Sequence, residues 1–160
     1  QHYLKSDDPQ TLGPEFEWHL RRAGGDTTGG PAPVDVLVAL RERVHTFVEM
    51  VERARVWYAP ITQWDDKAVA KHLRNAQAAP ILRELKDRLA ALTAWSPAAI
   101  HEVVAEVATK LGVGMGKVAQ PLRVAMTGTQ VSPSIEDTVY LAGRDRALRR
   151  IDDAVALAGA

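Results

Sequence analysis

The sequence contains no cysteine, which excludes a disulfide framework and thiolate metal sites and suits a reducing, cytoplasmic location. No uncharged apolar run approaches the roughly 18 residues that a membrane span requires. The first residues also lack the apolar segment of a secretory signal peptide. We therefore expect a cytoplasmic domain without a membrane segment.

An excess of charge is also missing, because 20 lysines and arginines balance 20 aspartates and glutamates. This balance argues against a strongly basic nucleic-acid binder. The charge is uneven along the chain, however, since residues 110–150 carry seven basic and three acidic side chains. Ordinary sampling can produce such an excess, so the basic stretch leaves both interpretations open.

Strand-like alternation of apolar and polar residues is absent, whereas helical spacing recurs along most of the chain. Apolar residues repeat at intervals of three and four, as in Leu37, Leu40, Val44 and Phe47, and again in Leu82, Leu85, Leu89 and Leu92. With 160 residues, 46% of them hydrophobic, the sequence predicts an all-α globular chain.

Helix boundaries are marked by capping residues and glycines. Thr46 followed by Glu49 is typical of a capping box and would split the apolar run 34–58 into two helices, although a threonine within one helix gives the same pattern. Further predicted helix starts are at Asp65, at Ser96 before Pro97 and at Ser132 before Pro133. Predicted helix ends are at Gly112 and Gly143.

Two punctuated stretches divide the predicted helices. Residues 24–33 hold four glycines and two prolines and are predicted to form a loop after a first helix from about Pro14 to Ala23. A second interruption lies at residues 93–97. We therefore predict a junction over residues 1–33 and two consecutive small helical bundles over residues 34–96 and 97–160.

Catalytic and metal-binding patterns are lacking. There is no nucleotide-binding glycine motif after a strand, and Gly112 to Lys117 resembles a phosphate loop only superficially. Adjacent acidic pairs diverge on a helix, and the serines before proline are better explained as caps. The histidines have no metal-ligand spacing: His2, His19, His45, His72 and His101. No catalytic residue, metal or cofactor is predicted for this chain.

Binding of a polyanion is better supported. Residues 110–135 combine a loop of small residues with Lys117, Arg123 and a predicted helix start at Ser132. A guanidinium beside the free amides of a helix start can meet phosphate or a base edge. One side of a later helix carries Arg146, Arg149 and Arg150, a candidate phosphate track. Pairing with Asp145, Asp152 and Asp153 explains these arginines slightly better. Core packing, before base stacking, is expected for Trp57, Tyr58, Trp64 and Trp95.

The stretch from Gly116 to Pro133 fits the pattern G-K-x-x-x-P-[LI]-R-x-A-x-T-G-x-x-x-[ST]-P. Together with residues 143–151, it resembles the C-terminal anticodon-binding region of bacterial glutamyl-tRNA synthetase. Upstream similarity includes Arg43, Thr46 and residues 72–74, and residues 1–4 resemble the end of that family's stem-contact region. The resemblance thus covers essentially the entire chain.

The resemblance implies an all-α cage that recognises the anticodon stem-loop of tRNA for glutamate. It also implies a longer parent, which ligates glutamate to tRNA using ATP and magnesium in a catalytic domain whose HIGH-type and KMSKS-type motifs do not occur here. This chain is then expected to be a monomeric, non-catalytic fragment, and the missing initiator methionine is interpreted as the cut. A helical module for protein–protein interaction is the alternative.

By motif match, the resemblance places Arg123, Ser132, Pro133 and Ile135 at the anticodon bases. Arg43 is the candidate for reading the first anticodon base. Additional tRNA contacts are predicted at Lys117, Arg146, Arg149 and Arg150.

Overall fold

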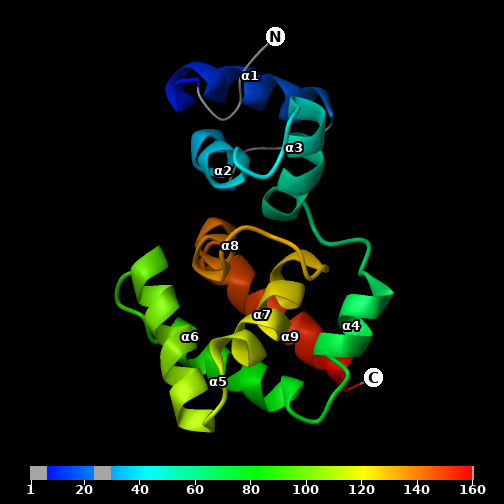
Figure 1. The fold of residues 1–160 in the computed structure, drawn as a ribbon, viewed down its shortest axis with the longest axis vertical. Coiled ribbons are helices and arrows are strands. Elements are labelled where there is room, and N and C mark those ends of the chain that lie inside the picture. Colours follow the sequence, from blue (N-terminus) through cyan, green and yellow to red (C-terminus); the bar gives the residue numbers. More distant parts are fainter. Residues whose placement is uncertain (1–6, 24–29, 160) are drawn as a thin grey trace. The chain divides into compact units, whose positions relative to one another are not determined.

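A computed structural model describes residues 7–23 and 30–159, and within them it contains α-helices, one short 3₁₀ helix and no strand (Figure 1). The all-α prediction is confirmed. The opening residues 1–6 and most of the glycine-rich segment, residues 24–29, lie outside the described residues, so the predicted loop there is not tested. The chain forms two compact units, residues 1–60 and 61–160.

The first unit packs a long helix against two short ones. Its elements are α1 (Pro9–Arg22), α2 (Pro33–Leu40), α3 (Phe47–Ala54) and the 3₁₀ helix η1 (Arg55–Trp57). Helix α1 contacts both α2 and α3. The spacing of its apolar residues buries one face, with Leu12, Phe16 and Leu20 each at most 2% exposed.

Helix α1 begins earlier than predicted. Pro9 occupies its first turn, and the carboxylate of Asp8 accepts a hydrogen bond of 3.0 Å from the amide of Gln10. The predicted start, Pro14, lies inside the helix. Both prolines are compatible with a helix start, and the capping aspartate decides in favour of the first.

The predicted division of the run 34–58 is confirmed. Helix α2 ends at Leu40, and α3 begins at Phe47. The hydroxyl of Thr46 accepts a hydrogen bond of 3.1 Å from the amide of Glu49, as a capping box requires.

The second unit surrounds one central helix. Its elements are α4 (Asp66–His72), α5 (Ala78–Ala90), α6 (Pro97–Leu111), α7 (Met115–Thr127), α8 (Ile135–Ala142) and α9 (Arg144–Ala158). Helix α7 contacts all five others in this unit (Figure 1). It buries Leu122, Val124 and Ala125 completely. Residues on α7 are therefore held from several sides.

The two compact units divide between Pro60 and Ile61, whereas the predicted subdomain boundary was at 96/97. Helices on the two sides of the turn at residues 93–97, α5 and α6, pack against each other within the second unit. The turn thus changes the direction of the chain without separating two cores.

Most predicted caps are confirmed. Asp65 accepts from the amide of Ala68, and Ser96 from that of Ala99, each at 3.1 Å. Gly112 ends α6 at φ 67°, and Gly143 ends α8 at φ 82°. The predicted helix cap at Ser132 is wrong.

The cap of α8 is Ser134, whose hydroxyl accepts from the amide of Asp137 at 3.3 Å. The helix therefore begins two residues later than Pro133 would suggest.

Candidate nucleic-acid interface

The two predicted contact residues Lys117 and Arg123 lie on one helix, α7 (Met115–Thr127). Gly114 is its N-cap. Pro121 lies inside the helix, where it removes one backbone donor and commonly bends the axis. The polar residues of the motif are thereby displayed on a regular element.

The arginine of the motif contacts the residues that the resemblance paired with it. Arg123 Nε donates to Ser132 Oγ at 2.8 Å, and Arg123 Nη2 lies 3.5 Å from the carbonyl oxygen of Pro133. Both Arg123 and Ser132 are half-buried. A guanidinium held by its Nε edge is oriented before any ligand arrives, and this is the property that edge recognition of a base needs.

Two threonines extend this arrangement. Thr138 Oγ1 of α8 lies 2.9 Å from Ser132 Oγ and 2.8 Å from the carbonyl of Ser134. Thr127 Oγ1 lies 2.9 Å from the carbonyl of Arg123 and accepts from the amide of Thr129 at 3.2 Å. The loop between α7 and α8 is thus tied to both helices through side-chain hydroxyls.

Gly128, which ends α7, has a left-handed φ of 78°. A Cβ there would come within 3.0 Å of the carbonyl oxygen of Gln63 and of a methyl group of Ile61. The Gly128 carbonyl also accepts from the amide of Asp65 at 2.9 Å. Only glycine combines this conformation with this close approach, so Gly128 fixes where the loop between α7 and α8 begins.

The other two residues that the resemblance named are placed differently. Ile135 is the first residue of α8, and its side chain is buried at 6% exposure. Arg43 is exposed in the turn after α2, in the first compact unit.

The predicted track of three arginines on α9 is not a uniformly exposed surface. Arg149 is exposed and Arg146 is half-buried, but Arg150 is only 6% exposed. Arg150 Nη1 donates to the carbonyl oxygen of Met126 at 2.6 Å. Since Met126 lies in the last turn of α7, Arg150 satisfies a carbonyl that the helix itself leaves without a donor.

Burial, together with the nearby charges of Arg146 and Arg149, lowers the pKa of Arg150 to about 10. The guanidinium remains protonated at neutral pH. Two of the acidic residues that were expected to pair with the α9 arginines can be compared with that expectation. Asp152 pairs with Lys86 at 2.8 Å. The Asp153 carboxylate favours the charged form of Arg150 and so acts to raise its pKa.

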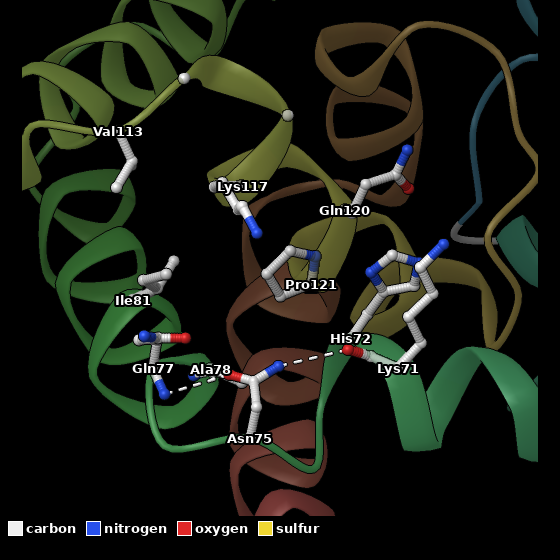
Figure 2. Close-up of a pocket in the computed structure, with 12 residues that line it drawn as sticks. Lys71, His72, Asn75, Gln77, Ala78, Ile81, Val113, Lys117, Gln120 and Pro121 are labelled. Atoms are coloured by element: carbon white, nitrogen blue, oxygen red, sulfur yellow. Dashed lines mark hydrogen bonds between the residues drawn. The ribbon is translucent and has the colours of Figure 1, made fainter.

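A pocket of about 710 Å³ lies beside the start of α7 (Figure 2). Its polar wall includes Lys117 and Gln120 from α7 and Lys71 and His72 from α4. Its apolar wall is formed by Ala78, Ile81, Val113 and Pro121. Sequence inspection missed Lys71, because no motif links it to Lys117 46 positions later.

The four aromatic residues that were expected in the core separate into two groups. Trp57 and Tyr58 are buried, as predicted. Trp64 and Trp95 are half-buried. The Trp95 indole donates to the carbonyl of Tyr140 at 3.2 Å, and the Arg144 guanidinium lies 5.6 Å from its ring centroid. Trp95 therefore joins the α5–α6 turn to the end of α8.

Within the described residues, no three acidic or histidine side chains cluster as a metal site would require. Across the same ranges, no helix has both the length and the apolar character to cross a membrane. Exposed apolar side chains lie on several elements, including Trp18 on α1, Val48 on α3 and Val131 before α8. Three more are close together in sequence at the junction of α6 and α7: Leu111, Val113 and Met115.

The family described as "Anticodon binding domain" matches residues 15–155. A glutamate--tRNA ligase of Xylella fastidiosa is 55% identical over 155 residues, which are 97% of this chain and 33% of that protein. One from Xanthomonas campestris is 54% identical over 160 residues, covering all of this chain and 34% of that protein. The chain spans about a third of the length of these curated relatives.

Two solved structures share the fold. A glutamate tRNA ligase from Elizabethkingia meningosepticum, in complex with its amino acid, superposes with a TM-score of 0.87 at 23% identity. A glutamate-tRNA synthetase from Elizabethkingia anophelis gives 0.81 at 22% identity. Each alignment covers 96% of this chain and 30% of the other.

Proposed function

The chain belongs to the anticodon binding domain family, and from this we propose that it is the tRNA-recognition region of a glutamate--tRNA ligase. It would bind the anticodon stem-loop of tRNA for glutamate and leave the ligation of glutamate to the parent's catalytic domain. The relatives that match over nearly all of this chain carry that ligase name. ATP and magnesium would then act in the parent's catalytic domain and not in this chain.

The observation that carries the proposal is the contact between Arg123 and Ser132. These residues are nine positions apart, on α7 and in the loop before α8, yet Nε and Oγ are 2.8 Å apart. Unpaired bases of an RNA loop are recognised on their edges, often by arginine and backbone groups. A half-buried guanidinium with a fixed orientation suits that task, because little of its conformational freedom is lost on binding.

The test is binding of anticodon stem-loop RNAs to this 160-residue chain at low salt, measured by fluorescence anisotropy. We expect a preference for the glutamate anticodon over hairpins with substituted anticodons. Arg123→Ala should reduce this preference by about 1–3 kcal/mol, roughly 5- to 150-fold in relative affinity. The α-helical circular dichroism should be unchanged, because Arg123 is not part of the buried core.

Equal binding of all hairpins by the unchanged chain would contradict anticodon recognition. Unchanged preference in Arg123→Ala would remove this arginine from the mechanism. A control variant, Arg83→Ala, changes the same residue type at an exposed position on α5 outside the motif, and it should retain the preference.

We further propose that the parent is cytoplasmic and that this region acts as a monomer. Sedimentation of the chain with and without the hairpin tests the monomer, for which a 1:1 complex is the expected result. A dimer that forms without RNA would favour the protein-interaction alternative.

A further inference from the structure

We propose that the pocket beside the start of α7 binds the sugar–phosphate backbone of the RNA, with Lys71 and Lys117 as its phosphate contacts. This inference rests on the proposed function and adds a backbone site to the base-reading residue Arg123. The two lysines come from different helices, α4 and α7, and line the same pocket (Figure 2).

The charge of the pocket is the first argument. Both lysines are exposed, and neither forms an ion pair with any residue in the ranges 7–23 and 30–159. None of the described residues that line the pocket is acidic. Two other lysines of this unit are neutralised locally, since Lys86 pairs with Asp152 and Lys110 with Glu84, at 2.8 and 2.7 Å. The pocket therefore concentrates positive charge that the protein itself does not compensate.

The walls of the pocket supply the second argument. Ile81, Val113 and Pro121 form an apolar surface beside the lysines, while Asn75 and Gln77 contribute amides at the turn before α5 (Figure 2). The side chain of Asn75 is engaged in that turn, where it donates to the Lys71 carbonyl at 3.3 Å and accepts from the Gln77 amide at 3.0 Å. A volume of about 710 Å³ lies within the range of small-ligand sites. An apolar wall next to cations fits a sugar or base face beside its phosphate.

The position of the pocket on α7 is the third argument. Lys117, Gln120 and Arg123 follow one another at intervals of three residues, so they form an oblique row that turns by about 60° around the helix at each step. Lys117 and Gln120 line the pocket, and Arg123 is the base-reading candidate. A single RNA strand that crosses α7 along this row could therefore reach both sites. RNA is favoured over an acidic protein partner because the pocket continues into the anticodon motif.

The experiment measures the salt dependence of hairpin binding. For single-stranded nucleic acid, the logarithm of the binding constant falls with the logarithm of salt concentration by about 0.7 for each phosphate contact. The double variant Lys71→Gln, Lys117→Gln should reduce this slope by about 0.7 to 1.4, corresponding to one or two lost contacts. It should weaken binding to cognate and substituted anticodons by the same factor, because phosphate contacts carry no sequence information.

The matched control is Lys86→Gln with Lys110→Gln, which removes the same charge from lysines already paired with carboxylates. We expect the control variant to have the same salt-dependence slope as the unchanged chain. The double variant Lys71→Arg, Lys117→Arg keeps both charges and should also have that slope. An unchanged slope in the Lys71→Gln, Lys117→Gln variant, or an equal loss in the control, would overturn the pocket assignment while leaving anticodon preference intact. Failure of the unchanged chain to prefer any anticodon would instead overturn the proposed function.

Discussion

The two ends of helix α7 are built in opposite ways. At its start, Gly114 and Gly116 have nothing within 4 Å of where a Cβ would be, and Lys117 faces an open pocket. At its end, Gly128 lies close to residues 61–64, and Arg150 donates a hydrogen bond to a carbonyl of the last turn. One end is available to a ligand, whereas the other is anchored by the protein.

The difference suggests how a small domain combines rigidity with access. The anchored end holds Arg123 and the loop that contains Ser132, so the proposed anticodon specificity would depend on packing in the second unit. The open end needs no such support, because a lysine contacts phosphate as a flexible point charge. Loss of an anchoring contact at the end of α7 should therefore lower stability, whereas loss of a lysine at its open start should affect binding alone.

The largest difference between the two ends is expected when one glycine at each end, Gly128 or Gly116, is replaced by alanine. Gly128→Ala imposes a left-handed conformation on alanine and brings Cβ to 3.0 Å from Gln63 and Ile61. We expect a loss of about 2–4 kcal/mol in the free energy of unfolding, from strain and overpacking together. Gly116→Ala, within the helix and in open space, should raise it by about 0.5–1 kcal/mol. Urea denaturation measures both, and a loss of equal size at the two positions would refute the contrast.

The next effect concerns the arginine at the anchored end. Arg150→Met keeps a long side chain but leaves the Met126 carbonyl without its charged donor, which we expect to cost about 1–3 kcal/mol. Arg149→Met, one position earlier and exposed, should change stability by less than about 0.5 kcal/mol. Thermal denaturation at neutral pH separates the two variants. Similar melting temperatures for both would show that the contact with α7 contributes nothing.

A smaller pair of effects separates recognition from capping in the loop before α8. Ser132→Ala removes the acceptor of Arg123 Nε and should lower anticodon preference by about 1 kcal/mol, as expected for one hydrogen bond. Ser134→Ala removes the cap of α8 and should lower stability by about 1 kcal/mol while sparing the preference. Hairpin binding and urea denaturation of each variant test this crossed pattern. The opposite assignment of effects would return the cap to Ser132.

The smallest effect is expected in the charged cluster that joins α5 and α6. Hydrogen bonds from Lys110 and Arg88 lower the pKa of Glu84. Stability from the Glu84 charge is therefore present above its unfolded pKa and is lost as pH falls through the lowered folded value. The stability difference between the unchanged chain and Glu84→Gln should be small at neutral pH and should disappear in acid. A difference that grows in acid would contradict this sign.

Much of the fold was predictable because local signals agreed with packing. Thr46, Asp65 and Ser96 each had a capping side chain at the start of an apolar repeat, and all three cap helices. Ser132 carried the same signal, yet its hydroxyl bonds to Arg123 and Thr138. Its cap assignment failed because Arg123 and Thr138, nine and six positions away, take the hydroxyl, and the local capping pattern does not include them.

The site was predictable where it depended on a contiguous motif and unpredictable where it depended on packing. Arg123, Ser132 and Pro133 lie within eleven residues and were identified together. The burial of Arg150 required knowing that α9 packs against the end of α7. Lys71 is brought to the pocket by the contact between α4 and α7, and helical periodicity does not determine such a pairing.

Because Lys117 and Arg123 are six residues apart on one helix, their separation along its axis is about 9 Å. The geometry of the α-helix sets this spacing, so a backbone contact and a base contact would be held in a fixed register along the RNA strand. A one-residue deletion between them would shorten the spacing by about 1.5 Å and rotate Arg123 by about 100° relative to Lys117. In the proposed binding mode, the length of this helical segment would therefore set which nucleotide Arg123 reads.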